Sequence, residues 1–121
     1  MMRLLAPFFL SLAALLPAQA QDYTPVKEKD AFLSLIEGRS LRMPLYGLTL
    51  SLTPDGRIVG QALGWGISGS WRWEDGFFCR DMDWSGMEIP FNCQLVEAKG
   101  VTNLRFTVDK GVGDSASFRL Q

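Results

Sequence analysis

The residues that could carry chemistry begin with a glycine-rich hexapeptide. Residues 64–69 read GWGISG, which has the Gly-x-Gly-x-x-Gly spacing of the phosphate-binding turn in dinucleotide-binding enzymes. In those enzymes a strand leads into the glycines and a helix leaves them, so that free N–H groups at the helix start meet the pyrophosphate. Here SWRWEDGFFC follows, and its alternating aromatic residues and Asp75-Gly76 dipeptide predict a strand and a hairpin turn. We therefore expect no nucleotide cofactor at this hexapeptide.

Carboxylate pairs are the second candidate. The chain has no histidine, which excludes Ser-His-Asp and Cys-His arrangements. The acidic pairs are Glu74/Asp75, Asp81/Asp83 and Asp109/Asp114. Asp81 and Asp83 would share one face of a strand, where a cation or an acid–base pair could form. Solvated acids beside Arg80 are the commoner outcome, because charged side chains are mostly exposed. We therefore expect no metal site and favour a protein without enzymatic activity.

Tryptophans are the third candidate, because all of them fall within residues 65–84. Trp71 and Trp73 alternate along a predicted strand, and the usual place for such residues is the core of a small barrel. Trp84 stands in the polar stretch DMDWSGMEIP between the two cysteines, so we expect it on an exposed loop that contacts a partner, an apolar ligand or a sugar. The complete set of candidate binding residues is Trp84, Arg80, Asp81, Asp83, Trp65, Trp71 and Trp73.

The N-terminus and the cysteines predict where the protein is located. Residues 1–20 read MMRLLAPFFLSLAALLPAQA. This segment has a positively charged start, an apolar run and a small-x-small cleavage site, which together are typical of a secretory signal peptide. The apolar run is shorter than the roughly 20 residues of a membrane span. We expect cleavage before Gln21, one mature domain over residues 21–121, and a periplasmic or secreted product. In such a compartment Cys79 and Cys93 should form a disulfide.

The remaining sequence predicts a small barrel. Phe32, Leu35 and Ile36 have the spacing of one helix face, and Gly38 is placed to end that helix. Beyond it the sequence reads as short strands separated by turn residues. The expected strands cover residues 48–52, 57–63, 67–74, 77–82, 91–98, 104–108 and 116–120. We predict an all-β antiparallel meander of about seven or eight strands, closed into a barrel of lipocalin-like shape, with one short N-terminal helix.

Several segments also resemble one family. They are DAFLSLIEGRSL, TPDGRIVG, GSWRWEDGFFCRDMDW, NCQLVE and LRFTVDKGVGDSASFRL, which together extend over nearly all of the predicted mature chain. They resemble a group of small exported alphaproteobacterial proteins labelled dihydrodipicolinate reductase, and that label implies an NAD(P)H-dependent activity. Dihydrodipicolinate reductases proper have two domains, a nucleotide-binding fold and a catalytic histidine and lysine. Because this chain has no histidine, no catalytic residue is carried over.

Three functional hypotheses follow. We favour a non-enzymatic monomer that binds an unknown small ligand or a periplasmic protein. The second hypothesis is an inhibitor of an exported enzyme, in which the segment between Cys79 and Cys93 acts as a rigid wedge. The third is the reductase that the family label implies. Basic and acidic residues nearly balance, 12 against 13, so nothing indicates nucleic acid or anionic lipid as a partner.

Overall fold

The computed structural model describes residues 22–121, and the predicted signal peptide lies outside this range. Most of the elements are strands that follow one another along the chain. They are β1 (Thr24–Pro25), α1 (Lys29–Ile36), β2 (Leu41–Met43), the 3-10 turn η1 (Pro44–Tyr46), β3 (Leu48–Leu52), β4 (Arg57–Ala62), β5 (Trp65–Glu74), β6 (Phe77–Trp84), β7 (Met87–Lys99), β8 (Asn103–Thr107), α2 (Val108–Gly111) and β9 (Ser115–Leu120). None of these helices has the length and hydropathy that a bilayer span requires.

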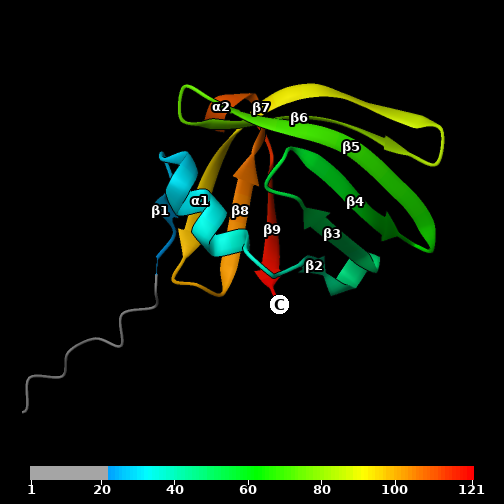
Figure 1. The fold of residues 1–121 in the computed structure, drawn as a ribbon, viewed down its shortest axis with the longest axis horizontal. Coiled ribbons are helices and arrows are strands. Elements are labelled where there is room, and N and C mark those ends of the chain that lie inside the picture. Colours follow the sequence, from blue (N-terminus) through cyan, green and yellow to red (C-terminus); the bar gives the residue numbers. More distant parts are fainter. Residues whose placement is uncertain (1–21) are drawn as a thin grey trace, which may run out of the picture.

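The strands form the predicted antiparallel barrel. Strands β2 to β9 each pair with the next strand in the chain, and β9 returns to pair with β2 through Leu41 and Leu120. The ring therefore has eight strands and follows the predicted meander order. The pairing between β6 and β7 ends at Gln94. Beyond that residue, at Ala98, the extra strand β1 pairs with β7. Figure 1 shows the strands curving around one interior, with α1 beside β8 and α2 at the end of β8.

Tight turns explain why neighbouring strands pair. The three hairpins from β4 to β7 each have a two-residue turn in which both residues have positive φ, as type I′ turns require. Glycine at the second position adopts this conformation without steric cost. The turn dipeptides are Leu63-Gly64, Asp75-Gly76 and Ser85-Gly86. The predicted turn at Asp75-Gly76 is thus confirmed.

Aromatic side chains fill one part of the barrel interior and hold α1 in place. Phe32 on α1 is fully buried. Its ring lies 4.9–6.3 Å, centroid to centroid, from the rings of Trp71, Trp73, Phe78 and Phe106. An isolated helix as short as α1 is not stable in water, so this packing is what keeps it folded. The predicted helix and its buried face are confirmed.

Several expected strand boundaries were wrong in detail. Strand β5 begins at Trp65 instead of residue 67, and β6 continues to Trp84 instead of ending at residue 82. The strand predicted over residues 104–108 ends at Thr107, and Val108 begins α2, where Asp109 and Lys110 have positive φ. The strand predicted from residue 91 begins at Met87 instead. Neither β1 nor β2 was predicted, because strands of two and three residues are too short to show an alternating pattern.

The hexapeptide GWGISG forms a turn and the first part of a strand, and its glycines have different roles. A Cβ atom at Gly69 would overlap the carbonyl oxygen of Asp81 and lie 2.9 Å from the Cα of Met82. A Cβ atom at Gly66 would meet nothing within 4 Å. Gly69 therefore allows β5 and β6 to approach closely, whereas packing places no such demand on Gly66. Strand β5 continues past Gly69, so no helix start is available there for a pyrophosphate.

We expect Gly69→Val to lower the free energy of unfolding by about 1–3 kcal/mol, because the new side chain must push two paired strands apart. Gly66→Val is the matched control on the same strand, and its stability should stay within about 0.5 kcal/mol of the parent. Urea unfolding followed by tryptophan fluorescence measures both. Equal losses in the two variants would contradict this role for Gly69.

Candidate functional site

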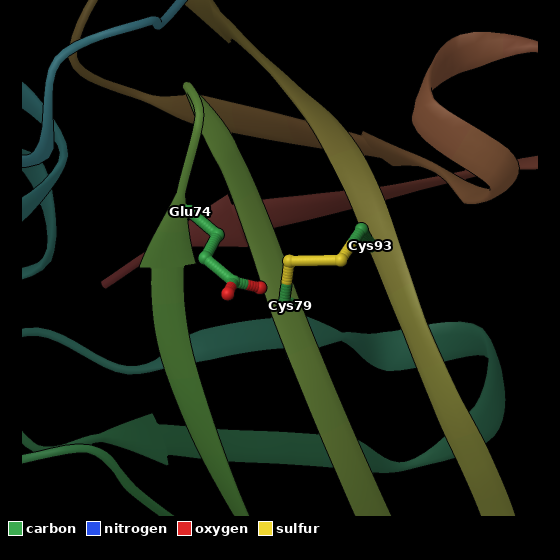
Figure 2. A group of neighbouring side chains, drawn as sticks. All are labelled: Glu74, Cys79 and Cys93. Atoms are coloured by element: carbon green, nitrogen blue, oxygen red, sulfur yellow. A yellow bond between two sulfur atoms is a disulfide. The ribbon is translucent and has the colours of Figure 1, made fainter.

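The two cysteines form the predicted disulfide. Cys79 on β6 and Cys93 on β7 lie directly opposite each other, with their Cα atoms 3.9 Å apart. Figure 2 shows the Glu74 side chain directed toward this disulfide, and its carboxylate and the two sulfur atoms lie within 4.8 Å of one another. Because each sulfur is bonded to the other, neither can act as a thiolate ligand. The Glu74 carboxylate instead pairs with Arg72, at 3.2 Å from Nε.

The segment between the cysteines is a hairpin, so the prediction of a loop that exposes Trp84 was wrong, whereas recognition by this segment stays a prediction. Only Ser85 and Gly86 form the turn, and the residues on either side belong to β6 and β7. Trp84 is half-buried against the core, and its indole N–H donates a hydrogen bond to the carbonyl oxygen of Ala62 at 3.2 Å. Its polar neighbours suggested exposure, but strand alternation turns Trp84 inward, on the same face as Met82.

The other tryptophans divide into core and surface. Trp71 is buried and donates its indole N–H to the carbonyl oxygen of Thr53 at 3.0 Å. Trp73 is half-buried and donates its indole N–H to the backbone carbonyl oxygen of Lys27 at 3.0 Å. Both are core residues, as predicted. Trp65 at the start of β5 is 61% exposed and lies outside the interior.

The acidic pair on β6 also lies outside the interior. Asp81 and Asp83 are both exposed and share the outer face, as the two-residue spacing predicted. Asp81 accepts a hydrogen bond from the Ser70 hydroxyl at 2.8 Å, and Asp83 accepts one from the Gly86 N–H at 2.8 Å. Each carboxylate therefore has a structural partner of its own, and the two do not converge on one point.

Arg80 is the one residue of the candidate set that combines charge with burial. It is 9% exposed and alternates with Asp81 on β6, so its side chain points into the barrel. Its Nη1 donates a hydrogen bond to the Pro90 carbonyl oxygen at 2.8 Å. Pro90 lies at a bulge, where β7 carries one more residue than β6 between two paired positions. Burial lowers the pKa of Arg80 and the neighbouring Asp81 carboxylate opposes that shift, but an arginine remains protonated at neutral pH.

A cavity of about 260 Å³ occupies the barrel interior beside Arg80. Its wall is mainly apolar and draws on both halves of the chain. The apolar and aromatic lining residues are Leu41, Leu50, Leu52, Ile58, Phe78, Met82, Phe106, Val108, Ala116 and Phe118. Arg80, Gln94, Asp114 and Ser115 complete the wall. Asp114 and Ser115 are exposed whereas Arg80 and Gln94 are buried, so the cavity opens to solvent at the segment that follows α2.

Hydrogen bonds hold α2 beside this opening. The Asn92 side chain donates to the Asp109 carboxylate at 2.8 Å and accepts from the Asp109 N–H at 3.0 Å. This pairing links α2 to β7 and stabilises the left-handed backbone at Asp109, a conformation that costs free energy in a residue other than glycine. Neither Gln94 nor the opening was expected from the sequence. The sequence does contain one indication of a polar group in the interior. Arg80 alternates with Asp81 and therefore shares the inward face of the strand with Phe78 and Met82.

Comparisons of this chain with protein-family models, curated proteins and solved structures found no match. The chemistry of the site is therefore argued from its own residues. A mostly apolar cavity with a few polar groups is suited to hold a small molecule, because the apolar wall supplies binding energy and the polar groups orient the ligand.

Proposed function

We propose that this protein is a non-enzymatic binding protein that holds one small, mainly apolar ligand inside a lipocalin-like barrel. The cavity of about 260 Å³ is the observation that supports this function. A barrel of about eight strands either fills its interior with side chains or holds one small ligand. A dry cavity of about 150 Å³ accommodates benzene. By proportion, the cavity in this barrel suits a ligand of roughly ten non-hydrogen atoms.

We further propose that the protein acts outside the cytoplasm. The predicted signal peptide supports export, and the disulfide between Cys79 and Cys93 is compatible with it.

Thermal unfolding with 1-octanol tests the proposed function. A ligand that binds only the folded state raises the melting temperature, so the wild-type protein should be stabilised by this probe. Ala116→Phe, which places a ring in the cavity, should abolish the shift. Ala31→Phe, at an exposed position on α1, is the matched control and should keep it. An absent shift in the wild type, or an equal shift in Ala116→Phe, would contradict ligand binding in the barrel.

Two further measurements test the other two hypotheses, thermal unfolding with NADPH and capture from a periplasmic extract. The resemblance to the family labelled dihydrodipicolinate reductase is what supports a reductase, and a melting temperature raised by NADPH would favour it over the binding protein. Inhibition of an exported enzyme would instead show as stable capture of one enzyme from a periplasmic extract, unaffected by Ala116→Phe because the contact would lie outside the cavity.

A further inference from the structure

We propose that the ligand is an anionic amphiphile, with a carboxylate head group bound by Arg80 and Gln94 and an apolar tail of about eight carbons in the cavity. This inference rests on the proposed function and names the class of ligand. It is carried by two buried polar side chains that face the cavity with most of their hydrogen-bonding capacity unused.

Arg80 is a buried cation without an anionic partner. Within residues 22–121, no carboxylate oxygen lies within 4.0 Å of its guanidinium. An arginine has five N–H donors, and the one side-chain hydrogen bond found for Arg80 in this part of the chain uses only Nη1. No fully buried side-chain nitrogen in the described residues lacks a partner, so the other guanidinium nitrogens keep some accessible surface, and Arg80 lines the cavity. A charge held away from water in this way is costly unless an opposite charge or water meets it.

Gln94 adds a second donor at the same place. It is 7% exposed, lies on β7 opposite Phe78, and points inward next to Arg80 on the facing strand. Gln94 and Arg80 both line the cavity. Arginine binds a carboxylate through two parallel N–H groups, and the glutamine NH₂ can donate to the same oxygens.

The remaining charges near the cavity favour this placement of an anion. Asp81 is next to Arg80 in the chain but lies on the outer face, bonded to Ser70. Asp114 lines the cavity at its exposed opening, where its negative charge disfavours an anion. The head group is therefore attracted to Arg80 and Gln94, and the apolar wall formed by residues such as Leu50 and Ile58 is left for the tail.

Three ligands of equal tail length test the inference by isothermal titration calorimetry: octanoate, 1-octanol and octylammonium. In the wild-type protein we expect octanoate to bind about tenfold or more tighter than 1-octanol, because its hydrogen bonds to the guanidinium are charge-assisted. Octylammonium should bind more weakly than 1-octanol. Equal affinities, or a preference for octylammonium, would overturn the inference while leaving the proposed function intact. Failure of all three ligands to bind would overturn both.

Variants then assign the preference to Arg80. Arg80→Met should remove the advantage of octanoate over 1-octanol, and Gln94→Leu should reduce it. Arg119→Met, at an exposed position on β9, is the matched control and should retain the full preference. If octanoate keeps its advantage in both Arg80→Met and Gln94→Leu, the head group binds elsewhere and the inference is wrong. Because the wild-type ranking is measured first, an Arg80 variant that fails to fold does not prevent the test.

Discussion

Alanine at position 32 should lower the free energy of unfolding by about 3–5 kcal/mol, the range found when a large buried aromatic side chain is truncated. Phe32 is fully buried and contacts four aromatic rings that come from β5, β6 and β8. Its loss removes the main contact through which α1 docks, and a helix of eight residues does not persist without docking. Urea unfolding measured by circular dichroism gives the change in stability.

Leu35→Ala is the matched control for this prediction. Leu35 lies on the same helix and is half-buried, so its truncation should cost clearly less than that of Phe32. Phe32→Leu, which retains most of the apolar volume, should also lose less than Phe32→Ala. If Phe32→Ala and Leu35→Ala are equally stable, the aromatic cluster is not what holds α1 on the barrel.

Replacing both cysteines with alanine should destabilise the protein by about 2–5 kcal/mol. The disulfide joins residues 14 positions apart, and closing a loop of about that size restricts the unfolded chain by roughly 3 kcal/mol in the chain-entropy model. It also joins β6 to β7 at the cross-strand position next to the one where Arg80 faces Asn92. Urea unfolding of the double variant measures the loss.

A reducing agent provides the control for the disulfide. Dithiothreitol should lower the stability of the wild-type protein toward that of the Cys79→Ala/Cys93→Ala variant and leave the variant itself unchanged. Alkylation of the unreduced wild-type protein followed by mass spectrometry should find both cysteines unmodified. Two alkylated cysteines, or a wild-type stability insensitive to dithiothreitol, would show that the disulfide is absent in solution.

Local signals in the sequence were sufficient to predict the fold class. Alternation of apolar and polar residues marks the strands, and dipeptides such as Asp75-Gly76 mark two-residue turns. Strands joined by such turns must pair with their chain neighbours, which leads directly to a meander. The helix around Phe32 was found in the same way, from the spacing of its apolar residues.

Contacts between distant segments decided what the local signals could not. The left-handed turn at Asp109 depends on the two hydrogen bonds between Asp109 and Asn92 on β7. Because Asn92 is distant in the sequence, the residues around 108 were predicted to continue the strand. Trp84 was placed on a loop because its neighbours are polar, although pairing between β6 and β7 extends to the turn and directs its ring inward. The small strands β1 and β2 exist only because β7, β3 and β9 offer them backbone partners.

The barrel, its strand order, the disulfide partners and the helix that packs on the interior were all predictable from the residues alone. The barrel, the strand order and the helix follow from patterns of residue types over a few neighbouring positions. The disulfide partners follow because the chain has only two cysteines. The candidate site was decided by the tertiary structure alone. The cavity is bounded by residues from Leu41 to Phe118, and its volume is the small difference between the space the ring encloses and the side chains that fill it. No local pattern encodes that difference, because it depends on the register and inward direction of every strand at once.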